Sequence, residues 1–266
     1  MISGVDEKNR ELLDLLSRSG GSLFSIKEAA HTLNMPVNKT RVQLSYLARR
    51  GWLSRVKRGL YISVPLGTLN PHEYKDNPWI IADRIFAPCY IGGWSAAEHL
   101  GLTEQIFRSI VICTGSGVRH RSTDVQGFNF ILKHVGKERL KMTKNVWFGN
   151  NKICVSTPSQ TIADILDDPS IGGGIRHVAE IVKNYFSSED RNDLALLKCI
   201  KVVGNRSVYK RLGYLLEVLN INAPEVIDTC RKNISAGYSA LDPTIKIKGT
   251  FNRGWNLRVN ATRINE

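Results

Sequence analysis

Two short helical patterns, broken by a proline and followed by two β-type runs, constrain the fold of residues 25–64 more than any other feature of the sequence. Apolar residues recur at helical spacing up to Leu33. Pro36 then disfavours helical dihedrals in the residue before it, so we expect the first helix to end there. The second pattern predicts a helix that Asn38 can cap and that ends at Gly51.

The second of these helices is predicted to carry an apolar and a polar stripe. We expect Leu44, Leu47 and Ala48 to face the core. The polar stripe, at helical spacing, consists of Lys39, Gln43, Tyr46 and Arg50. Side chains of these types hydrogen-bond base edges and phosphates, so the polar stripe points to a nucleic acid.

The sequence after this helix predicts a β-hairpin. Two β-rich runs within residues 52–64 flank a basic turn at residues 57–59 that contains a glycine. A helix-turn-helix followed by such a hairpin is a winged helix-turn-helix, and its second helix enters the major groove of DNA. An amphipathic helix predicted over residues 5–19 completes a small domain at residues 1–70.

The charge of this segment supports a polyanionic partner. No Asp or Glu lies between Glu28 and Glu73. The same run holds seven cations: Lys39, Arg41, Arg49, Arg50, Arg55, Lys57 and Arg58. The whole chain of 266 residues carries a net charge of +13, which fits binding to DNA. The alternative is a winged helix that contacts proteins while its charges are merely solvated.

The predicted DNA contacts follow from these patterns. They are Asn38, Lys39, Thr40, Gln43, Tyr46 and Arg50 on the helix, and Arg55, Lys57 and Arg58 in the hairpin. We expect Gln43 to read bases directly, because its amide pairs both ways with adenine. The hairpin cations would contact phosphates or the minor groove. Two alternatives stay open: Tyr46 could cover the domain surface, and Arg41 could be a packed strut.

Residues 78–266 predict a larger mixed α/β domain, which makes the fold class α+β. Prolines and turn formers in residues 65–78 place the boundary there. Strands are predicted at 109–114, 127–134, 145–148 and 152–156, and helices at 79–86, 159–166 and 175–186, with three more between 190 and 234. Arg108, Arg119 and Arg121 would either extend the DNA contact or form a solvated basic surface.

No catalytic or metal site is predicted. The five cysteines and six histidines are scattered, without metal-ligand spacing, so reduced thiols and no metal or cofactor are expected. Asp124, Asp164, Asp167 and Asp168 lack the pattern of a nuclease. Residues 172–174 are three glycines before a helix, but no GK[ST] follows, so a flexible hinge is favoured over a phosphate site. The absence of a signal peptide or apolar span predicts a cytoplasmic protein.

Five segments, taken together and in order, resemble one family. They are RRGWLSRVKRGLYISVP at 49–65, YIGGWSAAEHLGLTEQ at 90–105, VSTPSQTIADIL at 155–166, YKRLGYLLEVLN at 209–220, and RGWNLRVN at 253–260, which follows an LDP segment. In this combination the chain resembles the AbiEi-type antitoxins of bacterial type IV toxin–antitoxin systems. The resemblance extends over nearly the whole chain.

The resemblance implies a DNA-binding repressor and antitoxin. Its winged helix would bind inverted repeats in the promoter of its own operon, with two copies on the DNA and a monomer in solution. Its C-terminal domain would counteract a nucleotidyltransferase-like toxin without an obligatory tight complex. Two other functions stay open: a nuclease or nucleotide-processing enzyme that the winged helix brings to DNA, and a protein that neutralises a toxin by direct binding.

Overall fold

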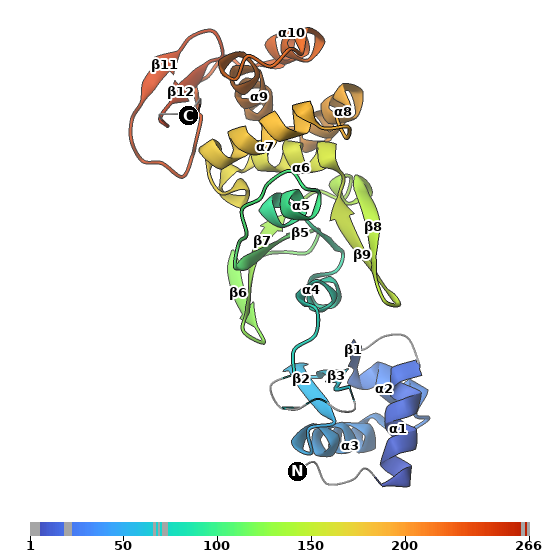
Figure 1. Ribbon diagram of the computed structural model, residues 1–266. Coiled ribbons are helices and arrows are strands. Elements are labelled where there is room, and N and C mark those ends of the chain that lie inside the picture. Colours follow the sequence, from blue (N-terminus) through green and yellow to red (C-terminus); the bar gives the residue numbers. More distant parts are fainter. Residues whose placement is uncertain are drawn as a thin grey trace. The chain divides into compact units, whose positions relative to one another are not determined.

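The computed structural model describes residues 6–18, 23–65, 68, 70, 74–261 and 264. It divides into two compact units (Figure 1). The first comprises Met1–Ala87, Asp124–Phe128 and Val146–Ile153, and the second comprises Pro88–Thr123, Asn129–Asn145 and Cys154–Glu266. Helices and strands occur in both units, so the predicted α+β class is confirmed. Part of the predicted linker, at residues 66, 67, 69 and 71–73, lies outside the described residues, and the boundary within it stays a prediction.

The first unit begins with the elements predicted for a helix-turn-helix and hairpin. In chain order they are α1 (Glu7–Arg18), β1 (Leu23–Ser25), α2 (Ile26–Thr32), α3 (Val37–Arg49), β2 (Leu53–Lys57) and β3 (Leu60–Ser63), with α4 (Pro78–Phe86) after them. The three strands form an antiparallel sheet in the order β1-β3-β2. The blue part of Figure 1 shows α2 and α3 joined by a short turn.

Local chemistry fixes the ends of α2 and α3. Ser25 and Glu28 form a reciprocal capping box, in which the Ser25 amide donates to the Glu28 carboxylate at 2.7 Å. Asn34 adopts a left-handed φ of 49° in the turn between the helices. The helix α3 begins at Val37, with Pro36 at the cap position and no side-chain cap. Asn38 therefore lies within the first turn, and the prediction that it caps α3 is wrong.

A six-stranded mixed sheet contributes most of its residues to the second unit, and its residues 124–125, 128, 146–148 and 151–153 belong to the first. Its strands are β4 (Cys89–Ile91), β5 (Ser109–Thr114), β6 (Ser122–Val125), β7 (Phe128–His134), β8 (Thr143–Phe148) and β9 (Asn151–Ser156). Their order is β6-β7-β5-β4-β9-β8. The pair β5–β7 is parallel and the pair β4–β5 is antiparallel, so the sheet is mixed. This agrees with the mixed α/β domain that the sequence predicted.

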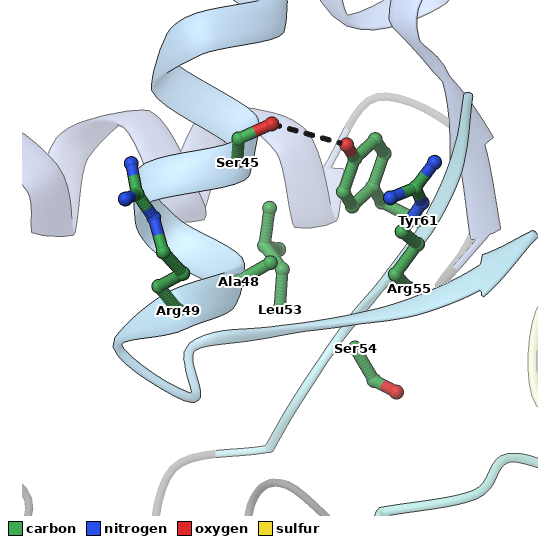
Figure 2. A pocket seen from close by; sticks show the side chains of 7 residues that line it. All are labelled: Ser45, Ala48, Arg49, Leu53, Ser54, Arg55 and Tyr61. Carbon is green, nitrogen blue, oxygen red and sulfur yellow. Dashed lines mark hydrogen bonds between the residues drawn. The ribbon is translucent and has the colours of Figure 1, made fainter. Parts of the chain in front are cut away.

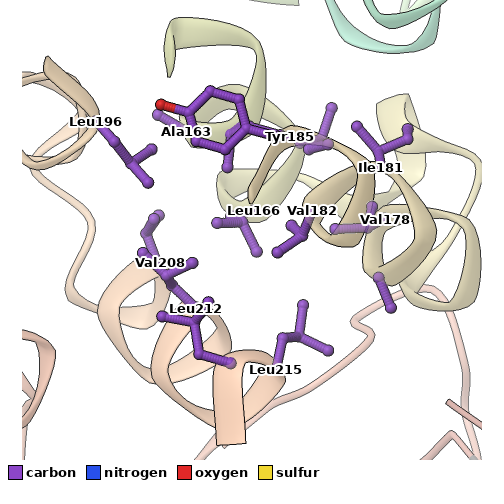
Figure 3. Packing of buried hydrophobic residues seen from close by; sticks show 14 of the residues in the cluster. Ala163, Leu166, Val178, Ile181, Val182, Tyr185, Leu196, Val208, Leu212 and Leu215 are labelled. Carbon is purple, nitrogen blue, oxygen red and sulfur yellow. The ribbon is translucent and has the colours of Figure 1, made fainter. Parts of the chain in front are cut away.

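Helices and a small second sheet complete this unit. The helices are α5 (Gly93–His99), α6 (Pro158–Asp167), α7 (Ile175–Ser187), α8 (Asp193–Val203), α9 (Arg206–Val218) and α10 (Pro224–Asn233), with short 3-10 turns at Arg139–Lys141 and Pro169–Gly172. The small sheet contains β10 (Ser239–Ala240), β11 (Thr250–Asn252) and β12 (Leu257–Val259), in the order β10-β12-β11. Figure 3 shows the apolar core among α6, α7, α8 and α9, where Leu166, Val182 and Leu212 are fully buried.

The three glycines at 172–174 form a packed turn, and the prediction of a flexible hinge is wrong. A Cβ at Gly172 would overlap the side chains of Val178 and Ile165. Gly174 has a φ of 90°, which favours glycine. The carboxylate of Asp242 accepts a hydrogen bond from the amide of Ile175 at 2.8 Å. The N-terminus of α7 therefore already holds an anionic group of the chain itself.

Candidate nucleic-acid interface

The exposed face of α3 lies opposite three buried residues. Thr40, Leu44 and Leu47 are fully buried, at the spacing of one helix face. The opposite face presents Asn38, Arg41, Val42, Ser45 and Arg49, of which only Ser45 is partly covered. At about 100° per residue, this exposed stripe lies about a third of a turn from the polar stripe that the sequence predicted.

Thr40 cannot contact DNA, contrary to the prediction. Its side chain is 0% exposed and its hydroxyl donates a hydrogen bond to the Pro36 carbonyl at 3.1 Å. A threonine that bonds back to the preceding turn satisfies its hydroxyl and can face the core. Thr40 thus belongs to the buried face of α3. Ala48, which the sequence pattern placed in the core, is only half-buried.

Gln43 connects α3 to α1 through a hydrogen bond. Its Nε2 donates to Oδ1 of Asn9 at 2.7 Å, and Asn9 is only 7% exposed. Asn9 is itself held by Asp6, which accepts from both its amide and its side chain at 2.8 Å. The half-buried Gln43 amide therefore has an intramolecular partner, and its expected role in reading bases is not favoured by this geometry.

Tyr46 and Arg50 cover the surface beside α3. The Tyr46 ring packs edge-on against Trp52, with ring centroids 6.3 Å apart. The Arg50 guanidinium lies 5.6 Å from the Tyr46 ring centroid, and its Nε donates to the Tyr46 hydroxyl at 3.4 Å. Tyr46 thus covers the domain surface, which was the alternative to a base contact.

Besides Arg50, five of the predicted contact residues keep exposed side chains. They are Asn38, Lys39, Arg55, Lys57 and Arg58. Asn38 and Lys39 lie in the first turn of α3, where residues of a recognition helix reach base edges. Arg55 and Lys57 lie in the strand β2, whose register shifts between them, and Arg58 lies in the turn that follows. Gly59 closes the turn with a φ of 81°, and its carbonyl accepts from the Ile26 amide at 3.1 Å.

A groove of about 510 Å³ lies between α3 and the hairpin. Figure 2 shows the seven residues that line it: Ser45, Ala48, Arg49, Leu53, Ser54, Arg55 and Tyr61. Arg49 comes from the helix and Arg55 from the strand β2, on two sides of the groove. Between them, the hydroxyl groups of Ser45 and Tyr61 lie 3.5 Å apart.

The chemistry of this groove suits a phosphate. Both arginine side chains are exposed, and neither forms an ion pair with any residue that the structure describes. Guanidinium groups bind phosphate oxygens bidentately, and hydroxyl groups can donate to the same oxygens. Arg41, Ser45 and Arg49 were not among the predicted contacts. The spacing of Thr40, Leu44 and Leu47 was the signal that could have identified them.

Of the additional cations in the second unit, one is already neutralised. Arg121 pairs with Asp168 at 2.7 Å, whereas Arg108 and Arg119 are exposed. The neutralised Arg121 is therefore a weaker candidate for DNA contact than the other two.

The aspartates of α6 belong to a buried polar network. Asp164 is fully buried, accepts from the Tyr90 hydroxyl at 2.7 Å, and lies 3.4 Å from the Arg139 guanidinium. Asp167 pairs with Lys133 at 2.8 Å and with Arg139 at 3.0 Å. Burial raises the pKa of Asp164 above its usual value. These carboxylates bind cations and donors of the chain itself and hold the helices on the sheet.

The segments that carried the family resemblance in the second unit have structural roles. In α5, the Trp94 indole donates to the Ser109 carbonyl at 2.8 Å. In α9, Arg211 donates to the carbonyls of Leu166 at 2.7 Å and Leu241 at 3.0 Å. Trp255 is 1% exposed, so it is a core residue.

Among the residues that the structure describes, no group of three or more His, Cys, Asp or Glu could hold a metal ion. None of the helices in this described part is long and apolar enough to cross a membrane. All five cysteines are free thiols, and four of them are buried.

Comparison with known proteins identifies the N-terminal segment. Residues 10–64 match the family model described as "Transcriptional regulator, AbiEi antitoxin". The resemblance to AbiEi antitoxins is thus confirmed for these residues, which contain α3, the hairpin and the groove. No curated protein matches the chain in sequence.

A solved structure shares the fold over almost the whole chain. The RV2827C protein from Mycobacterium tuberculosis superposes with a TM-score of 0.66 at 13% identity, and the match covers 96% of this chain and 92% of that one. At this identity the likeness concerns the fold alone.

Proposed function

We propose that this protein is a DNA-binding repressor of its own toxin–antitoxin operon and the antitoxin of that system. One observation carries the proposal. Within the segment that matches AbiEi regulators, the exposed face of α3 continues into a groove flanked by Arg49 and Arg55, which have no anionic partner in the described part of the chain. A positive surface of this kind is suited to the DNA backbone.

The contacts divide by chemistry into base readers and phosphate binders. Asn38 and Arg41 project from the first half of α3, and these side chain types pair bidentately with adenine and guanine in the major groove. Arg49, Arg55 and the hairpin residues Lys57 and Arg58 neutralise phosphates on either side of the groove that α3 enters. Lys39 and Ser45 add hydrogen-bond donors, Lys39 beside this face and Ser45 within it.

Two copies of the protein bind the promoter, one on each arm of an inverted repeat. A chain that is monomeric in solution can bind such a repeat because the two-fold symmetry comes from the DNA itself. The second unit counteracts a nucleotidyltransferase-like toxin in the cytoplasm without catalysis or a cofactor. The match to antitoxin regulators, which covers residues 10–64 of the first unit, supports an antitoxin function for the chain, and the resemblance of segments in the second unit supports placing that function there.

A nuclease function is not favoured by any observation. The acids that such a function would need, Asp164, Asp167 and Asp168, are paired with Arg139, Lys133 and Arg121. No second function is therefore proposed.

A mobility-shift assay with the DNA upstream of the operon tests the proposal. The full chain should retard a duplex that contains the repeats, and retard a scrambled duplex of equal length only at a higher concentration. Raising the salt concentration should weaken both complexes, because phosphate contacts release counterions. Equal retardation of both duplexes by folded protein would contradict specific repression.

A further inference from the structure

The small C-terminal sheet exposes two aromatic rings. Tyr238, directly before β10, is 49% exposed, and Phe251 in β11 is 66% exposed. Their ring centroids lie 4.8 Å apart with an interplanar angle of 67°. Aromatic side chains of this size normally pack in the core or in an interface, so an exposed pair marks a binding surface.

The strand register places both rings on one face of the sheet, beside an arginine. Phe251 and Ala240 are each paired with Arg258 of the central strand β12. Tyr238 precedes Ala240 by two residues, and side chains two apart on a strand share a face. The opposite face carries Leu257, which is fully buried. Nε of Arg258 is buried and has no hydrogen-bond partner among the described residues.

Exposed cations lie in the segments on either side of β11. Lys246 and Lys248 lie in the segment that leads into β11, and Arg253 follows the strand. None of these three forms an ion pair with a residue that the structure describes. Between residues 229 and 261 the only acid is Asp242. That carboxylate is buried and accepts from the amides of Ile175 and Thr244, so it leaves the positive charge uncompensated.

We propose that this aromatic–cationic face binds single-stranded nucleic acid. The face is defined by Tyr238, Phe251 and Arg258 together with Lys246, Lys248 and Arg253. Unpaired bases stack on the two rings, and the flanking phosphates bind the cations. Bases within a duplex are stacked on each other and cannot use the rings. The carboxylates of an acidic protein would pair with the cations but offer no planar base to stack on the two rings.

This site is separate from the duplex-binding face of the first unit, and the inference does not depend on the proposed repressor function. It predicts that the full chain binds two classes of nucleic acid through different residues. Substitutions in each surface should then affect one class and leave the other unchanged.

Fluorescence anisotropy with labelled oligonucleotides tests the inference on the full chain. The probes are an oligo-uridine and an oligo-thymidine of about 12 nucleotides, within the range of known single-strand site sizes. Tyr238→Ala and Phe251→Ala should each weaken binding of the single strands roughly five-fold or more, because each removes one stacking platform. Tyr238→Phe keeps the ring and should bind as the wild type does. The uridine and thymidine probes distinguish RNA from DNA as the preferred strand.

Two controls make the result decisive. The double variant Arg49→Ala/Arg55→Ala should keep single-strand affinity while its affinity for promoter duplex falls. Loss of both activities would place single-strand binding in the first unit and overturn the inference. Failure of the folded wild type to bind either oligonucleotide would also overturn it. Unchanged affinity in both alanine variants would overturn it as well. The same holds if polyglutamate displaces the oligonucleotide equally well from the wild type and from the ring variants.

Discussion

Thr40 shows how one polar residue sets the orientation of a helix. The apolar pattern alone predicted that Leu44, Leu47 and Ala48 face the core. The predicted contact stripe was therefore rotated around the helix axis relative to the stripe that the structure exposes. The hydroxyl of Thr40 bonds to the Pro36 carbonyl, so this threonine is buried at no cost in unsatisfied polar groups. Arg41 is therefore exposed rather than a packed strut.

Gln43 and Arg41 should give opposite results when each is replaced by alanine. Gln43→Ala removes the hydrogen bond to Asn9 and should lower the free energy of unfolding by about 1 kcal/mol, with the DNA sequence preference unchanged. Arg41→Ala should leave stability unchanged and relax discrimination at one base pair by about 1–3 kcal/mol. Denaturant unfolding and binding to single-base promoter variants measure the two effects. A changed base preference in the Gln43 variant would show that Gln43 contacts bases in the complex.

Asp167 predicts a pH-dependent contribution to stability. Burial would raise its pKa, but Lys133, Asn205 and Arg139 together outweigh burial, so the pKa lies below its ordinary value of 3.8. A carboxylate with a lowered folded-state pKa stabilises the fold above 3.8 and loses this contribution as the pH falls through its folded-state pKa. Asp167→Asn should cost about 3 kcal/mol at neutral pH, since it removes the nearest carboxylate from two largely buried cations, Lys133 and Arg139.

The difference in unfolding free energy between the wild type and Asp167→Asn should shrink as the pH is lowered below 3.8. Urea titrations across the acidic range measure it. Replacement of the exposed Glu138, which pairs only with Lys141 three residues on, is a matched control and should change stability little. A difference that stays constant into the acidic range would show that the Asp167 charge does not stabilise the fold.

At the scale of elements, long periodic segments were predicted well and short strands were not. The strand β5 occupies Ser109–Thr114 as predicted, and α4 begins one residue before its predicted start. β4 is only three residues long and fully buried, so it has no alternation to reveal it. The strand β6 carries Thr123 and Val125 on one face but Ser122 and Asp124 on the other, and its four residues are too few to form a clear pattern. Such strands form because neighbouring strands satisfy their backbone groups, which sequence pattern does not show.

The close packing of α9 on Trp255 makes a prediction about one glycine. A Cβ at Gly213 would overlap the Trp255 ring, which is buried and donates through its indole to Glu217 at 2.6 Å. Gly213→Ala should therefore lower the free energy of unfolding by about 1–3 kcal/mol or more, despite the better helix propensity of alanine. Gly117→Ala is the control, since a Cβ there meets no atom within 4 Å. Thermal unfolding compares them, and equal melting temperatures would contradict the packing argument.

At the scale of the whole molecule, the chain combines a unit whose residues 10–64 match transcriptional regulators with a larger unit of helices on a mixed sheet. The sequence predicted the winged arrangement and the basic surface because both depend on local pattern and composition. It could not identify the groove, since Arg49 and Arg55 come together only when the hairpin packs against α3. The exposed pair of Tyr238 and Phe251 likewise depends on the register of the small sheet.

The affinity of the double variant Arg49→Ala/Arg55→Ala for promoter duplex tests the central claim most directly. Because the variant lacks two guanidinium groups that bind phosphate, its affinity for specific and scrambled duplex should weaken alike. The slope of log affinity against log salt concentration should become shallower by about the amount expected for two phosphate contacts. Arg121→Ala, which removes an arginine already paired with Asp168, should bind as the wild type does. Wild-type affinity and an unchanged salt slope in the folded double variant would show that DNA does not bind at this groove.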